Sequence, residues 1–345
     1  MDGERYITST KIELDSDIDI SLRPKSLESF VGQSKVKQNL KIYIEAAKKR
    51  RECLGHTLLY GPPGLGKTTL AHIIANEMGA DIKVVSGPAL SSMLDIVSIL
   101  TGLEEGEVLF IDEIHRVNKL VEEALYSAME DFTLDIVQGK GPGARTIKLP
   151  INRFTLVGAT TRTGMLTGPM RDRFVNVCKL EKYTLSEIGD IIKRSSNILN
   201  VKIDEEACSK LADRSRGTPR IANRLLKNIR DFAQVIGKGY IDTEITDKAL
   251  SSIGIDDKGL DDNDRAVLEA LIVKFSGKPV GLETLAAAVN EDQGTIEDVI
   301  EPYLIQLGFI SRTPRGRVAM PEAYKHLGIK MPSSMQMNFL DGDLG

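Results

Sequence analysis

The sequence has no tryptophan, only three cysteines and four histidines, and no apolar run that approaches the ~20 residues of a membrane span. Cys53, Cys178 and Cys208 form no C-x-x-C pair, and the histidines are equally scattered, which argues against a disulfide framework and against a zinc site. Residues 1–10 lack the basic-then-apolar order of a signal peptide. We therefore expect a cytoplasmic protein that works in a reducing compartment.

Neither sign of charge is in large excess. The 45 basic and 49 acidic residues leave a net charge of −4, so any contact with nucleic acid must depend on a local basic patch. At 345 residues the chain is too long for one hydrophobic core and suits two or three domains.

Residues 61–68, Gly-Pro-Pro-Gly-Leu-Gly-Lys-Thr, fit the phosphate-binding pattern G-x-x-x-x-G-K-[ST]. They lie between a predicted strand, Thr57–Tyr60, and a predicted helix, Thr69–Met78. The backbone N–H groups of such a glycine-rich turn (here Gly61, Gly64 and Gly66) point into one concavity at a helix N-terminus. Lys67 is expected to reach the β- and γ-phosphates, and Thr68 to bind Mg²⁺. The motif predicts that the chain binds a nucleoside triphosphate.

Two carboxylates follow the continuously apolar segment Val108–Ile111, which is typical of a central strand buried on both faces. Asp112 is predicted to hold the Mg²⁺ shell, and Glu113 to accept a proton from the attacking water. His115 is expected to be a packed or solvated bystander. At the end of another apolar segment, Thr160 is a candidate for orienting the water or sensing the γ-phosphate.

Three arginines are candidates for contacting the phosphates. Arg171 and Arg173 come just before the last predicted strand, and arginine stabilises the transition state of phosphoryl transfer either in cis or from a neighbouring subunit. Arg220 opens a helix of the second domain, from which it could reach the γ-phosphate and couple closure of that domain to the nucleotide.

The alternation of apolar strands with helices from Leu22 to Leu180 predicts an α/β domain with a parallel sheet. From Thr184 the spacing becomes helical, and from Asp256 three helices and a hairpin are typical of a winged-helix module. The expected strands are 57–60, 83–86, 108–111, 154–159 and 175–180, and the three helices are 264–275, 282–289 and 295–307. The expected divisions are a mobile arm (1–21), an ATPase domain (22–183) with an inserted β-hairpin (132–149), a helical lid (184–255), a winged-helix domain (256–330) and a disordered tail (331–345).

In this order, residues 61–68, 110–115, 158–162, 171–174 and 216–220 (GPPGLGKT, FIDEIH, GATTR, RDRF and RGTPR) resemble the motifs of AAA+ ATPases. More narrowly, from about Leu22 to Ile329 the chain resembles the RuvB family, ring-forming ATP-driven motors that move Holliday junctions during DNA recombination and repair. The resemblance implies a AAA+ P-loop ATPase domain, an all-α lid and a C-terminal winged helix. It also implies ATP and Mg²⁺ as ligands, and a RuvA-like junction-binding protein and a RuvC-like resolvase as partners.

Carried over to this sequence, the resemblance implies a role for each matching residue. Leu22, Arg23 and Tyr183 flank the adenine, while Gly64, Lys67, Thr68 and Thr69 hold the phosphates. Asp112 and Glu113 form the Walker B pair, Thr160 is the first sensor and Arg220 the second. Arg173 is the finger offered to the adjacent subunit, and Glu130, Asp131 and Phe132 lie against the neighbouring site. One departure concerns the finger, because Val175 stands where the family commonly has glycine.

The predicted DNA contact is on the wing of the winged helix. The helix that would normally read the major groove carries Glu297, Asp298 and Glu301, which phosphates repel. The wing carries Arg312, Arg315 and Arg317, a compact group suited to contacting phosphates without reading sequence. In the inserted hairpin, Leu134, Ile136 and Ile147 suggest a docking surface, unless Leu134 and Ile136 pack on the parent domain. The resemblance implies that the junction-binding partner docks on this hairpin.

Other functions remain open from the residues alone. Asp-Glu-Ile-His also fits a DExH helicase box, although only one P-loop domain fits the chain. A clamp loader or initiator-type switch would bind ATP to hold a state of DNA or protein, and differs from a motor in that hydrolysis does not move DNA. The arginine wing argues against a protein unfoldase, and the lack of a fitting Asn-Lys-x-Asp motif argues against a GTPase.

Overall fold

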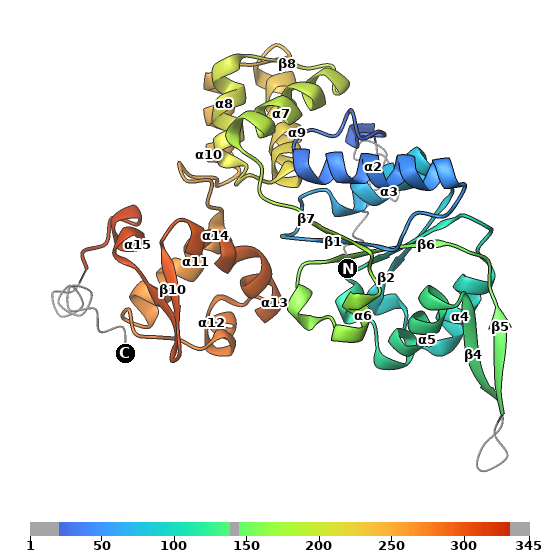
Figure 1. The fold of residues 1–345 in the computed structure, drawn as a ribbon. Coiled ribbons are helices and arrows are strands. Elements are labelled where there is room, and N and C mark those ends of the chain that lie inside the picture. The colour runs from blue at the N-terminus through green and yellow to red at the C-terminus, as the bar shows by residue number, and fades with distance from the viewer. Residues whose placement is uncertain (1–20, 139–144, 332–345) are drawn as a thin grey trace, which may run out of the picture. The chain divides into compact units, whose positions relative to one another are not determined.

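The computed structural model describes residues 21–138 and 145–331 (Figure 1). The expected arm, the turn of the inserted hairpin and the expected tail lie outside these residues, apart from Ser21 and Met331. The chain divides into two compact units. One comprises the residues up to Asn200 together with Thr218–Arg220, and the other comprises Val201–Gly217 and the residues from Ile221 onward.

The first unit contains the predicted parallel sheet. Its strands are β1 (Thr57–Tyr60), β2 (Ile82–Ser86), β3 (Val108–Asp112), β6 (Thr155–Thr160) and β7 (Asn176–Lys179), in the order β2-β3-β6-β1-β7. All neighbouring pairs are parallel, and the register places Tyr60 beside Thr160 and Ser86 beside Asp112. The carboxyl ends of the strands therefore meet at one edge of the sheet, as the sequence predicts.

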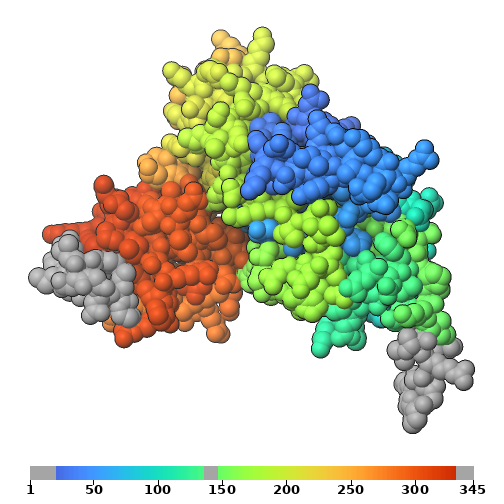
Figure 2. Space-filling model, in the orientation of Figure 1, coloured from blue at the N-terminus to red at the C-terminus, as the bar shows by residue number. Residues whose placement is uncertain are grey.

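Helices cover both faces of this sheet (Figure 1). Figure 1 draws α2 (Ser34–Arg50) and α3 (Lys67–Met78) on one side, and α4 (Met93–Thr101), α5 (Lys119–Glu130) and α6 (Gly168–Asp172) on the other. The core against α4 and α5 contains Ile96, Leu100, Val121 and Leu125, all fully buried against strand residues such as Leu109. The opposite layer contains α2, which contributes to the blue part of the surface in Figure 2. A further helix, α7 (Leu185–Ile198), follows the sheet and groups with this unit.

The inserted segment forms the predicted hairpin of β4 (Thr133–Gln138) and β5 (Arg145–Pro150), which extends from the domain beside α5 (Figure 1). Leu134 pairs with Leu149, and Ile136 with Ile147. The prediction that Leu134 belongs to a docking surface is wrong, because this side chain is fully buried in the core next to α5. Ile147 is exposed, and the side chain of Ile136 lies outside the described atoms.

The second unit begins with the helices that follow the sheet domain. They are α8 (Glu205–Arg214), most of α9 (Pro219–Ile236) and α10 (Thr243–Ser252), as the helical spacing predicts. Two short strands, β8 (Lys202–Ile203) and β9 (Tyr240–Ile241), also pair in parallel. The sequence did not predict this pair, because two residues are too few to show a strand period.

The rest of this unit has the predicted order of three helical segments and a hairpin. The first segment is α11 (Asp262–Glu269) continued by a π turn, η5 (Ala270–Lys274), and the second is α12 (Leu282–Val289). The third consists of α13 (Gln293–Thr295), a π turn, η6 (Ile296–Ile300), and α14 (Glu301–Gln306). Its hydrogen-bonding pattern changes from π to α just before Pro302, which lacks a backbone N–H. The hairpin is β10 (Ile310–Thr313) with β11 (Gly316–Ala319), followed by α15 (Pro321–His326). None of the helices in the described part of the chain has the length and apolarity needed to cross a membrane.

Candidate functional site

The loop of residues 61–66 joins β1 to α3 at the carboxyl edge of the sheet. Helix α3 begins at Lys67, two residues earlier than predicted, with Gly66 as its N-cap at φ 97°. Gly64 has φ 78°, and a Cβ added there would lie 2.7 Å from Thr218 Cγ2 and 3.1 Å from Arg220 Cβ. The absence of a side chain at Gly64 therefore lets the segment Thr218–Arg220 approach the loop, where the N–H of Arg220 points to the Gly64 carbonyl at 3.4 Å.

Lys67 is held by the loop itself. Its Nζ donates to the carbonyls of Gly61 and Pro62, both at 2.8 Å, and the residue is buried. Burial lowers the pKa of Lys67, and the nearby charges of Asp112 and Glu113 oppose this effect. A lysine ammonium aligned by backbone carbonyls beside two carboxylates suits the neutralisation of a phosphate chain.

Glu113 follows β3 in a strained conformation, with φ 53° in the left-handed region. Its N–H donates to Asp112 Oδ1 at 3.0 Å, which orients the Asp112 carboxylate. The carbonyl of Glu113 also packs against Gly87, where an added Cβ would lie at 2.4 Å. Left-handed non-glycine residues cost free energy and persist where the surrounding structure holds them, often at functional sites.

His115, which was expected to be a bystander, connects two of the predicted site residues. Its Nδ1 lies 2.9 Å from Thr160 Oγ1, and its Nε2 lies 3.9 Å from Glu113 Oε2. Thr160 is buried and also accepts a hydrogen bond from the N–H of Arg162 at 2.9 Å. The imidazole thus links Glu113, which follows β3, to Thr160 at the end of β6. Its spacing from Asp112 gave no signal of this, because the partner is 45 residues away in sequence.

The three residues expected to flank the adenine differ in their surroundings. Tyr183 is buried, its hydroxyl donates to the Leu65 carbonyl at 3.2 Å, and burial raises its pKa. Leu22 is buried, and its carbonyl accepts a hydrogen bond from Arg194 Nη1 at 3.0 Å. Arg23 is exposed. The structure therefore brings Tyr183 directly against the P-loop.

Arg173 is held within its own subunit. Its Nη1 donates to the Pro169 carbonyl at 2.7 Å, and its Nη2 lies 3.0 Å from Glu130 Oε1. The guanidinium also lies over the ring of Tyr126, 4.2 Å from its centre. The Nε atom is buried with no hydrogen-bond partner among the described residues. Val175, the departure from the family pattern, is exposed and has no positive φ.

The three residues matched to the neighbouring site have different environments. Glu130 pairs with Arg173, and Asp131 is exposed. Phe132 has φ 50° and packs edge-on against Phe154, with ring centres 6.1 Å apart. Glu130 and Asp131 are thus displayed at the surface, whereas Phe132 is partly committed to the core of its own unit.

The arginine wing differs from the expected free basic tip. Glu301, which was expected to repel DNA, is fully buried and forms ion pairs with both Arg312 and Arg317. A buried carboxylate requires such partners, because an unpaired charge in the interior is costly. Arg317 is therefore mostly covered, with 15% of its side chain exposed, whereas Arg312 and Arg315 are exposed.

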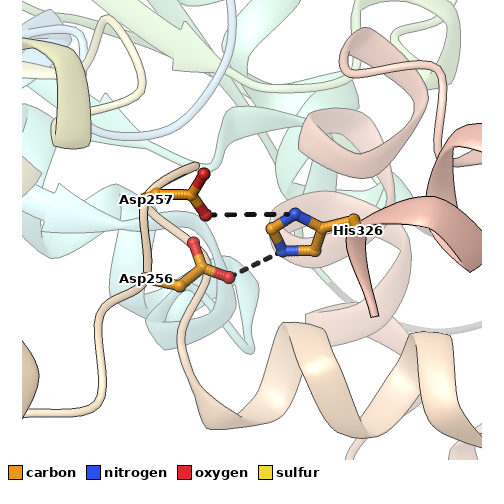
Figure 3. Close-up of side chains that lie close together, drawn as sticks. All are labelled: Asp256, Asp257 and His326. Carbon is orange, nitrogen blue, oxygen red and sulfur yellow. Dashed lines mark hydrogen bonds and ion pairs between the residues drawn. The ribbon is translucent and has the colours of Figure 1, made fainter. Parts of the chain in front are cut away.

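A cluster of Asp256, Asp257 and His326 joins the start of the winged-helix segment to α15 (Figure 3). The two imidazole nitrogens face different carboxylates, Nε2 at 2.8 Å from Asp256 and Nδ1 at 4.0 Å from Asp257. Arg265 Nη1 also lies 3.7 Å from the same Asp256 oxygen. A metal would need the ligands aimed at one point, so this arrangement suits an ion pair between α15 and the chain that precedes α11.

Comparison with known proteins gives a consistent result along the chain. The model of the Holliday junction DNA helicase RuvB P-loop domain matches residues 22–180, that of the RuvB AAA lid domain matches 183–256, and that of the RuvB C-terminal winged helix domain matches 257–328. Among solved structures, the Thermotoga maritima RuvB Holliday junction branch migration motor is 51% identical, with a TM-score of 0.83 over 90% of this chain and 100% of that chain. A lysine-to-arginine variant of the same Thermotoga maritima protein is also 51% identical, with a TM-score of 0.84 over 90% of this chain and 99% of that chain.

Proposed function

The chain belongs to the RuvB family of Holliday junction DNA helicases, and from this we propose that it is a ring-forming motor that pulls duplex DNA to move four-way junctions. It is an ATPase of the helicase type. The observation that carries the proposal is the convergence of Lys67, Asp112, Glu113, Thr160 and His115 at one edge of the sheet.

Each group in this site has chemistry suited to ATP hydrolysis. Glu113 accepts the proton of the attacking water, and Thr160 orients that water. Lys67 and the N–H groups at the start of α3 stabilise the negative charge of the phosphates. Mg²⁺ fits the site, because the Thr68 hydroxyl and the Asp112 carboxylate are the oxygen ligands it prefers, and when bound it neutralises phosphate charge. Arg220, which follows the Thr218 contact with the loop, senses the nucleotide.

Hydrolysis requires Arg173 from an adjacent subunit of the ring, which we propose is a hexamer. Glu130, Tyr126 and the Pro169 carbonyl hold the guanidinium in one place. A guanidinium fixed in advance loses little side-chain entropy when it meets a phosphate. The nearby acidic residues, Glu130 and Asp131, are displayed on the same part of the surface and would face the neighbouring nucleotide.

The rest of the chain supplies contacts to DNA and partners. The wing arginines, Arg312, Arg315 and Arg317, contact the DNA backbone without reading sequence. The exposed face of the hairpin that carries Ile147 docks a RuvA-like junction-binding protein, and a RuvC-like resolvase works on the same junction. Leu134 is not part of that face, since it is buried.

Mixing two inactive variants tests the shared site. Lys67→Ala removes a phosphate contact but leaves Arg173 to donate, whereas Arg173→Ala keeps its own phosphate site but lacks the finger. Neither variant alone should hydrolyse ATP, and the mixture should recover activity at the interfaces where an intact Arg173 faces an intact P-loop. Arg171→Ala is the matched control, because Arg171 is an exposed neighbour on α6. Activity of Arg173→Ala alone, or no recovery in a mixture shown to co-assemble, would contradict the proposal.

A further inference from the structure

The carboxylate of Glu301 joins the two strands of the wing to α14. Its Oε1 accepts hydrogen bonds from Arg312 Nε and, at 3.2 Å, from Arg317 Nε. Its Oε2 accepts from Arg317 Nη2 at 3.1 Å and Nε at 3.3 Å. Glu301 has no solvent-exposed surface. One buried carboxylate is thus shared by two guanidinium groups.

The register of the hairpin explains why the two arginines need this partner. Arg312 and Arg317 are directly opposite each other in the β10–β11 pair, so their side chains leave the same face of the hairpin. Like charges at such positions repel each other and would turn their side chains apart. Glu301 offsets that repulsion with two attractions, and the group of three carries a single positive charge.

The backbone of Arg317 is fixed as well. Its N–H donates to the Val280 carbonyl at 2.7 Å, and its carbonyl accepts from the Val280 N–H at 2.9 Å. This bridge requires glycine at the preceding position, because a Cβ on Gly316, at φ 134°, would lie 2.3 Å from the Val280 carbonyl oxygen. Both ends of Arg317 are therefore held, and its guanidinium has little freedom to reorient.

We propose that Glu301 is a positioning residue for DNA binding, which holds Arg312 and Arg317 side by side as a preformed contact for the phosphate backbone. The inference rests on the proposed role of the wing. A guanidinium carries five N–H donors, so Arg317 retains donors for a phosphate while it binds Glu301. Fixing the pair in advance reduces the side-chain entropy lost when DNA binds.

A positioning role for Glu301 and a simple effect of net charge would change DNA binding in opposite directions when Glu301 is neutralised. Removing a negative charge next to two arginines should strengthen binding to a polyanion if only net charge matters. If Glu301 positions the arginines, Glu301→Gln should instead weaken binding. Glu297→Gln is the matched control, because Glu297 is partly exposed and its Oε1 lies 3.9 Å from Arg312 Nη2, whereas Glu301 is fully buried. It removes the same charge and should leave binding unchanged or slightly stronger.

The experiment measures binding of the full-length protein to a fluorescent duplex by anisotropy at several salt concentrations. We expect Glu301→Gln to weaken binding by about fivefold or more on unrelated sequences. The slope of log K against log salt should become shallower by an amount that corresponds to the loss of about 1 to 2 phosphate contacts. Equal or tighter binding by Glu301→Gln, with normal thermal melting, would overturn the positioning role.

Two further variants keep the outcome decisive. If Glu301→Gln does not fold, Glu301→Asp can be used, because it keeps the charge but shortens the side chain. A positioning role then predicts weaker DNA binding, whereas an effect of net charge alone predicts unchanged binding. The double change Arg312→Ala with Arg317→Ala tests the wing itself. Undiminished DNA binding by this double variant would contradict the proposed function, whereas loss of binding there with unchanged binding by Glu301→Asp would contradict only the role of Glu301.

Discussion

Gly64→Ala should separate the P-loop from the segment that carries Arg220. Two effects act at this position. The residue has φ 78°, so any side chain there adopts a left-handed conformation. The new methyl group would also lie 2.7 Å from Thr218 Cγ2 and 3.1 Å from Arg220 Cβ, and the segment would have to move away.

The chain supplies a control for the first effect. Gly79, at the other end of α3, has φ 72°, but an added Cβ would meet no atom within 4 Å. Gly79→Ala should therefore lower the free energy of unfolding by about 1 to 2 kcal/mol through the left-handed backbone alone. Gly64→Ala should lose a similar amount of stability, and in addition should displace Thr218 and Arg220 from the loop.

Thermal melting with and without ATP, together with steady-state hydrolysis, measures both effects. Both variants should melt at lower temperature than the unaltered protein. Only Gly64→Ala should lose most of the stabilisation that ATP provides and at least about tenfold of kcat/KM, which corresponds to ~1.4 kcal/mol. If Gly64→Ala and Gly79→Ala hydrolyse ATP equally well, the contact of Thr218–Arg220 with the loop has no part in nucleotide binding.

Two other side chains give predictions of different kinds. His115→Ala should lower kcat by about tenfold or more with a smaller change in KM, because it removes the link between Thr160 and Glu113 without touching the P-loop; an unchanged kcat in single-turnover hydrolysis would show that the link is only structural. His56 accepts a hydrogen bond from the Leu156 N–H at Nδ1, and burial lowers its pKa below the usual 6.5. The unfolded chain then binds the proton more readily, so this group makes the protein less stable as pH falls below about 6.5, by at most ~1.4 kcal/mol per pH unit. Melting at pH 7.5 and 5.5 should show a smaller acid loss for His56→Gln, and an equal loss would refute this assignment.

The centre of the sheet was predictable because β3, β6 and β1 are short, largely apolar runs that both layers of helices bury. Val108–Ile111 and the run that ends at Thr160 show this directly, and each is followed by polar residues at the site edge. The P-loop was equally clear, since its pattern specifies both the loop and the elements around it. Helix α3 began earlier than predicted because Gly66, at φ 97°, already serves as its N-cap.

The contacts that the sequence did not reveal are those between residues distant in the chain. The hydrogen bond of His115 with Thr160 depends on β3 and β6 lying side by side. Leu134 belongs to an alternating pattern typical of an exposed hairpin, yet the base of the hairpin packs on α5 and buries it. The sequence predicted that Glu301 lies on a helix and repels DNA phosphates. Only in the folded winged helix do Arg312 and Arg317 come to lie beside it. Local pattern gives no information about such pairings.

The most direct test of the account uses a labelled synthetic four-way junction. The protein, Mg²⁺, ATP and a RuvA-like junction-binding protein are incubated with the junction, and Lys67→Ala serves as the control. We expect ATP-dependent separation of the junction into two duplexes, and loss of this separation with Lys67→Ala. ATP hydrolysis with no movement of the junction would contradict the motor and would favour an ATP-dependent switch or loader.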